Sequence, residues 1–216
     1  MDYAIARHNM VESQIRPNKV TDERLISAMA SLPREVFVPK EFQSVAYVDE
    51  AIPLGDGRYL MEPLITARLI QAAQPAPGDV ALTIGCGTGY GAAVLSHMVS
   101  TVVAVECDGG LAQQATQTLT DLGIDNVAVI HDPLEDGYAD QAPYDVIFFD
   151  GAVAEIPDVI SSQLAEGGRL VAVVAGDGVG DARLVTRHQG ELSSRPVFDT
   201  GTPSLPGFEG KATFVF

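Results

Sequence analysis

Residues 80–90 read Val-Ala-Leu-Thr-Ile-Gly-Cys-Gly-Thr-Gly-Tyr, an apolar run that leads into three glycines at alternate positions. A continuous apolar run of this length predicts a strand that is buried on both faces, as in a parallel sheet. The glycines predict a tight turn against which a ligand can lie, because a side chain would occupy that space. Residues 90–98 then read as a helix. The alternative interpretation is a plain strand-to-helix turn without a ligand.

A carboxylate stands where such a ligand would need one. Glu106 follows the next apolar run, residues 102–105. At the end of a strand beside a glycine turn, a carboxylate can accept hydrogen bonds from both hydroxyls of a ribose. The G-x-G-x-G spacing differs from the G-x-G-x-x-G of dinucleotide sites and resembles the nucleoside-binding loop of class I methyltransferases. The alternative for Glu106 is a solvated acid at a strand end.

The alternation of an apolar run with a helical stretch continues along the chain. Further strand-length apolar runs lie at residues 102–105, 127–130, 146–149 and 170–174, with helical stretches at 90–98, 111–122 and 156–164. This alternation predicts an α/β fold with a doubly wound, mostly parallel seven-stranded sheet of the Rossmann-like type. Residues 182–188 and 212–216 are the candidate final strands, and residues 201–210 are predicted to be a loop.

A helical layer precedes this core. Apolar residues at three-to-four spacing predict helices within residues 3–32, with Thr21 or Asp22 as a cap. Prolines and glycines make residues 33–57 rich in loops, and a helix is expected from Pro63 until Pro75. We therefore expect an N-terminal layer on the substrate side, residues 1–62, and an α/β cofactor-binding core, residues 63–216, that form one structural unit.

Composition excludes several classes of function. The chain has 216 residues, of which 46% are hydrophobic and 19% charged, so it can bury a core. Its net charge of −16 argues against nucleic acid as a partner, because a phosphate backbone would be repelled. No membrane span or export signal is evident, which predicts a cytoplasmic protein. Two cysteines and four scattered histidines predict neither a disulfide framework nor a metal site.

Several segments carry a resemblance to a known family. They are residues 11–15, 28–39, 46–47, 84–95, 142–147, 156–157, 163–164 and 167–170. Through these the chain resembles the protein-L-isoaspartate O-methyltransferases over nearly its whole length. That family repairs damaged proteins by methylating the free α-carboxylate of isoaspartyl residues with S-adenosylmethionine, which leaves S-adenosylhomocysteine.

The resemblance also implies a cofactor site. The glycines would face the cofactor, Glu106 its ribose, and Asp132 with its two following residues the adenine. For Asp132 the alternative is a helix cap. The full set of expected cofactor-binding residues is Thr83, Gly85, Cys86, Gly87, Gly89, Tyr90, Glu106, Cys107, Asp132, Pro133 and Leu134.

The chain departs from the family pattern near the expected methyl-transfer centre. Tyr59 and Met61 stand where the family has a threonine and a serine, and Thr83 stands where it usually has a glutamate. Asp150 follows the fourth apolar run, at the edge where open α/β sheets bind ligands. Tyr59, Met61 and Asp150 are therefore the candidate catalytic positions, and Arg58 with Tyr59 is a candidate holder of an acidic substrate. The alternatives are a strand-end acid turned to solvent for Asp150 and an ordinary surface loop for Arg58 and Tyr59.

These residues support three functional hypotheses. The first is a methyltransferase that acts on a carboxylate of a protein or peptide, with weak or no isoaspartyl activity because Met61 cannot replace a hydroxyl donor. The second is a cofactor-binding module without catalysis. The third is a methyltransferase for an acidic small molecule, because the fold alone does not fix the substrate.

Overall fold

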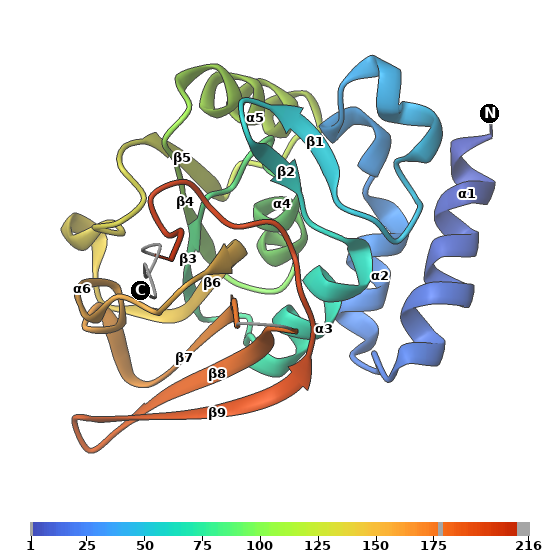
Figure 1. Ribbon diagram of the computed structural model, residues 1–216. Helices are drawn as coiled ribbons and strands as arrows, with labels where there is room; N and C mark the ends of the chain where they lie inside the picture. Colours follow the sequence, from blue (N-terminus) through green and yellow to red (C-terminus); the bar gives the residue numbers. More distant parts are fainter. Residues whose placement is uncertain (1, 177–178, 211–216) are drawn as a thin grey trace, which may run out of the picture.

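A seven-stranded sheet forms the centre of the computed structural model, which describes residues 2–176 and 179–210 (Figure 1). The strand order is β5-β4-β3-β6-β7-β8-β9. The strands are β3 (Val80–Ile84), β4 (Thr101–Glu106), β5 (Val127–His131), β6 (Tyr144–Val153), β7 (Leu164–Val174), β8 (Asp181–His188) and β9 (Glu191–Asp199). The first five of these run parallel to one another, whereas β8 pairs antiparallel with β7 and β9 pairs antiparallel with β8. The prediction of a mostly parallel seven-stranded sheet is confirmed.

Both faces of the sheet are covered, as the apolar strands predicted. Ala81 belongs to one buried hydrophobic cluster and the adjacent Leu82 to the other. Successive side chains of a strand point to opposite faces, so burial of both requires a layer on each side. The strand predicted at residues 212–216 lies outside the described residues, and β9 is a strand that the sequence analysis missed.

The helices between the strands begin and end close to the expected residues. They are α3 (Pro63–Ala73), α4 (Tyr90–Ser96), α5 (Gly109–Asp121) and α6 (Asp158–Ser161). Pro63 occupies the first turn of α3, where a missing N–H costs nothing. Helix α6 is one turn rather than the nine residues predicted, because Pro157 precedes it and β7 begins at Leu164.

The N-terminal residues form a separate group of helices, to the right of the sheet in Figure 1. They are α1 (Tyr3–Met10), a π-helical turn (Val11–Ile15), a short 3-10 turn (Arg16–Asn18) and α2 (Glu23–Ser31), followed by 3-10 turns at Arg34–Phe37 and Lys40–Val45. Asp22 caps α2, as one of the two expected candidates, by accepting the backbone N–H groups of Arg24 and Leu25. Met10 and Leu25 share a buried cluster with Val94 of α4, which joins this layer to the sheet.

Two segments outside the seven-stranded sheet meet at the carboxyl ends of its parallel strands. One is an antiparallel hairpin that the sequence analysis read as loop, β1 (Ile52–Gly55) and β2 (Arg58–Leu60), drawn in cyan at the top of Figure 1. It forms its own two-stranded sheet. The other is the segment 200–210, where Leu205 donates its backbone N–H to the carbonyl of Ala152 at 2.8 Å.

The expected helices of the N-terminal layer and core are short. In the part of the chain that the structure describes, every helix is too short or too polar to span a bilayer.

Candidate functional site

The glycine turn after β3 is held against the neighbouring strand. The backbone N–H groups of Gly85 and Cys86 both donate to the carbonyl of Val105, at 2.9 and 3.0 Å. Gly85, Gly87 and Gly89 have φ values of 75°, 55° and 97°, in the region that favours glycine. The turn therefore has a fixed conformation that other residues would strain.

The space beside each glycine is occupied by a different part of the chain. A Cβ atom on Gly85 would lie 2.5 Å from Cδ2 of Leu205, and one on Gly87 would lie 3.0 Å from Cδ1 of Leu54. A Cβ atom on Gly89 would instead lie 3.3 Å from Cβ of Ala115 in α5. Gly85 and Gly87 thus face the hairpin and the segment 200–210, whereas Gly89 permits close packing of α5.

Glu106, at the end of β4, is fully buried and receives several hydrogen bonds. The backbone N–H of Gly87 donates to its Oε2 at 2.6 Å, and the backbone N–H of Asp108 donates to its Oε1 at 3.1 Å. Arg58 of β2 donates to the same two oxygens, from Nη2 to Oε2 at 2.7 Å and from Nε to Oε1 at 3.3 Å. Glu106 is not the solvated acid of the alternative interpretation.

The ion pair determines the charge of both partners. Burial acts to raise the pKa of the Glu106 carboxyl, but the hydrogen bond and charge of Arg58, with the two backbone donors, hold that pKa below its usual range. Burial likewise opposes the charge on Arg58, yet Glu106 raises the pKa of the guanidinium above its usual value. Both groups are therefore ionised, and the pair lies where a cofactor ribose was expected.

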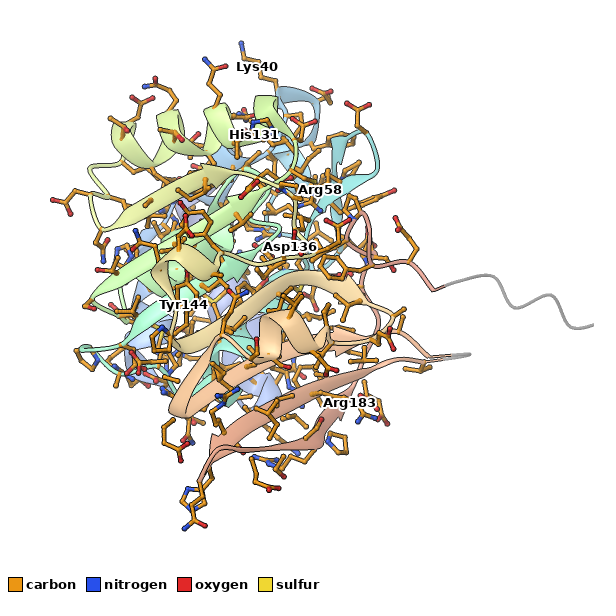
Figure 2. All side chains as sticks on the ribbon, turned by 90° about the vertical axis from the view of Figure 1, so that its left-hand side faces the viewer. Lys40, Arg58, His131, Asp136, Tyr144 and Arg183 are labelled. Atoms are coloured by element: carbon orange, nitrogen blue, oxygen red, sulfur yellow. The ribbon has the colours of Figure 1, made fainter. Side chains whose placement is uncertain are left out.

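Figure 2 shows the labelled Arg58 where the hairpin meets the ends of the sheet strands. Its side chain is only 3% exposed. Arg58 is a candidate holder of an acidic substrate by its sequence position, but in the structure its guanidinium donates to Glu106 and, at 2.9 Å, to the carbonyl of Gly85. A distance of 48 residues in the chain separates Arg58 from Glu106, so no local pattern could have paired them.

A hollow of about 580 Å³ lies at the ends of β4 and β5, and the residue that follows Glu106 lines it. Its lining includes three of the residues expected near the cofactor, Cys107, Asp132 and Pro133, together with His131, Glu135, Pro206 and Gly207. Leu134 is buried beneath it, in one of the two core clusters. Turn residues rather than a helix follow Asp132, so the alternative of a helix cap does not apply.

Asp150 and Thr83 lie in the interior beside the glycine turn. Asp150 is 4% exposed and Thr83 is fully buried. Within the described part of the chain, neither Oδ2 of Asp150 nor Oγ1 of Thr83 has a hydrogen-bond partner. Burial raises the pKa of Asp150 to about 7, although the charges of Arg58 and Arg34 oppose this shift. Such unpartnered groups in a buried site indicate a place for a polar ligand.

The remaining candidate positions differ in exposure. Tyr59 is 38% exposed on the hairpin, whereas Met61 is 1% exposed. The backbone of Met61 is fixed by Arg34, a residue that the sequence analysis did not single out. The guanidinium of Arg34 is fully buried, donates to the carbonyls of Met61 at 2.7 Å and Ala46 at 2.8 Å, and lies over the ring of Tyr90. Because Arg34 stands beside Glu35, ahead of the apolar residues 36–38, the sequence gives no signal that its guanidinium is buried.

With this geometry in place, the chain can be compared with known proteins. A model of the family described as protein-L-isoaspartate(D-aspartate) O-methyltransferase matches residues 6–200. A Koribacter versatilis protein-L-isoaspartate O-methyltransferase is 38% identical over 208 residues, which cover 96% of this chain and 94% of that protein. A relative of the same name from Roseiflexus castenholzii is 43% identical over 176 residues, covering 82% and 80%.

Solved structures of the same enzyme class share the fold. One protein-L-isoaspartate O-methyltransferase superposes with a TM-score of 0.82 at 28% identity, covering 93% of this chain and 66% of that chain. A Plasmodium falciparum protein described with the same activity, crystallised with S-adenosyl-L-homocysteine, gives a TM-score of 0.77 at 20% identity and covers 95% of this chain.

Proposed function

The chain belongs to the protein-L-isoaspartate O-methyltransferase family, and we propose that it transfers a methyl group from S-adenosylmethionine to a carboxylate of a protein or peptide. The observation that carries this proposal is the position of Glu106. It accepts a hydrogen bond from the glycine turn, and the next residue, Cys107, lines the hollow beside Asp132, an order that suits a ribose followed by an adenine.

The residues of the site fit such a cofactor. Gly85 and Gly87 bring no side chain to the turn, Glu106 would accept the ribose hydroxyls in exchange for a present donor, and Asp132 with Pro133 would border the adenine. Asp150 offers a buried carboxyl oxygen without a partner among the described residues, which suits a positively charged group of the methyl donor. Thr83 offers a hydroxyl in the same region but no charge.

Methyl transfer requires mainly that the protein position the reacting groups. The cofactor, when bound, supplies an activated methyl group. A carboxylate acceptor is already ionised near neutral pH, so it needs no general base. The chain's own residues would therefore hold the acceptor oxygen near the methyl group and exclude water from the site. The apolar ends of Leu54 and Leu205 beside the glycine turn serve the second purpose.

The acceptor is proposed to meet the protein at the hairpin. Tyr59 is an exposed residue of the hairpin, and its phenolic O–H can donate to a carboxylate. Met61 is buried and its thioether cannot donate, so the family's serine contact is absent. We therefore expect carboxyl methylation in which isoaspartyl peptides are poor acceptors.

Two measurements in sequence test the proposal. Calorimetry with S-adenosylhomocysteine should show binding at one site. Transfer of a labelled methyl group from S-adenosylmethionine to an isoaspartyl peptide, beside the matched aspartyl peptide and a mixture of aged proteins, then reports the acceptor. Absence of cofactor binding in the folded protein would refute the proposal. Binding without methylation of any carboxylate would leave a cofactor-binding module.

A further inference from the structure

Glu106 has no free position for a ribose in the structure. Its two oxygens receive donors from Arg58, Gly87 and Asp108, and one longer contact from Sγ of Cys107 at 3.5 Å. A carboxylate offers about four lone-pair directions, so these donors fill it. A ribose can therefore reach Glu106 only if a donor leaves. The two backbone donors are fixed by the glycine turn and by α5, which leaves Arg58.

The hairpin covers the glycine turn at more than one point. Arg58 also donates to the carbonyl of Gly85, and its Nη2 lies 3.3 Å from the place of a Cβ on that glycine. Leu54, on the other strand of the hairpin, lies in the same way against Gly87. The space beside the two glycines is thus occupied by Arg58 and Leu54 of the hairpin together with Leu205 of the segment 200–210.

We propose that Arg58 is an internal competitor of the cofactor: it binds Glu106 and must be displaced before the ribose can bind. This inference rests on the proposed function. Arg58 thereby sets the affinity of the site, because the apparent dissociation constant rises as the fraction of molecules with an open Glu106 falls.

The ends of the hairpin, Ile52 and Leu60, are buried in the core, whereas its turn is exposed and does not pair with the main sheet. Strands β1 and β2 pair with each other and form no ladder with the seven-stranded sheet. Gly55, Asp56 and Gly57 close the hairpin with positive φ values, and a Cβ on either glycine would meet no atom within 4 Å. Displacement of Arg58 therefore breaks its contacts with Glu106 and Gly85 without unravelling the main sheet.

The inference is tested by the affinity for S-adenosylhomocysteine, measured by calorimetry on the full chain. Arg58→Met keeps the length of the side chain and removes its donors, so it should bind about tenfold more tightly or better, the range expected for one charge-assisted contact. Arg58→Lys keeps a charge but has no planar pair of donors, so its affinity should lie between those of the wild type and Arg58→Met. Arg16→Met removes an exposed arginine from a surface ion pair and should bind as the wild type does.

Equal or weaker binding by a folded Arg58→Met variant would overturn the inference while leaving the proposed function intact. Absence of binding in the wild type and in both Arg58 variants would instead refute the cofactor assignment. If Arg58→Met does not fold, Arg58→Lys decides by the same comparison. A crystal structure with S-adenosylhomocysteine should show Arg58 beyond hydrogen-bond distance of Glu106, and an intact Arg58–Glu106 pair beside bound ligand would also overturn the inference.

Discussion

A Cβ atom placed on Gly91 would lie 2.4 Å from Oδ2 of Asp150. Gly91 lies in α4, where glycine is less favourable than alanine by about 1 kcal/mol, and its φ is not positive. The carboxyl group of Asp150 therefore explains why residue 91 has no side chain. The helix loses a little stability, and in exchange an acid fits into the interior beside the glycine turn.

The raised pKa of Asp150 makes stability depend on pH. An acid whose folded pKa is raised destabilises the folded state once pH exceeds its ordinary value of 3.8, and the loss levels off above its folded pKa of about 7. This difference between the two pKa values corresponds to a loss of about 4 kcal/mol at most in the free energy of unfolding. Asp150→Asn removes the ionisation, so its stability relative to the wild type should increase between pH 4 and pH 8. Urea unfolding across that range checks this, and a constant difference would show that Asp150 is not the group involved.

Glu106→Ala should weaken S-adenosylhomocysteine binding by roughly tenfold to a hundredfold, because hydrogen bonds to a charged group contribute about 1.5 to 3 kcal/mol. The same substitution also releases Arg58, which offsets part of the loss. In an Arg58→Met background the loss should therefore be larger than in the wild type. A double-mutant cycle measured by calorimetry gives the coupling. A loss below about threefold in both backgrounds would place the ribose elsewhere.

Gly87→Val should abolish cofactor binding, because its side chain would fill the space beside the turn and its φ of 55° is unfavourable for valine. Gly190→Val is the matched control for backbone strain alone. Gly190 has a φ of 79° in the β8–β9 turn, and no atom lies within 4 Å of its Cβ position. Thermal unfolding of both variants with and without S-adenosylhomocysteine separates the effects. Only Gly87→Val should lose the stabilisation by ligand, and retention of that stabilisation would contradict the assignment.

Isoaspartyl methylation by the wild type should be at least about 30-fold slower than by a chain with the family's hydroxyl residues at positions 59 and 61. The reason is that the two missing hydroxyl contacts cost on the order of 2 to 5 kcal/mol. Tyr59→Thr together with Met61→Ser should raise the rate. Because Met61 is buried, the serine also leaves a cavity, so stability must be measured beside activity. Tyr59→Thr alone is the control that leaves the core unchanged. Rapid wild-type turnover of an isoaspartyl peptide would show that the altered loop is competent.

The sheet could be predicted where burial on both faces leaves a continuous apolar run, as in β3 and β4. The strand β9 was missed because it lies at the edge of the described sheet, where Glu191, Ser193 and Arg195 are exposed and Pro196 interrupts the pattern. The hairpin was missed for a related reason. Pro53, Gly55 and Gly57 resemble loop, and its two strands have only four and three residues.

The positions of the expected cofactor residues follow from the order of strands. Carboxyl ends of parallel neighbours meet at one edge, which brings the glycine turn, Glu106 and Asp132 together. Their use by a cofactor stays a prediction. What no spacing indicated is that Arg58 would reach Glu106, or that Gly91 makes room for Asp150. Such contacts between distant residues depend on side-chain directions that only the packed structure fixes.

Arg34 binds a carbonyl from each of two segments, Ala46 in the N-terminal layer and Met61 beside the hairpin. Both acceptors are backbone carbonyls, which any residue at positions 46 and 61 supplies, so this anchor depends on the path of the main chain and not on those side chains. A chimera that imports residues 52–62 from a relative should therefore keep the anchor, provided that the imported segment has the same length and the chain keeps Arg34.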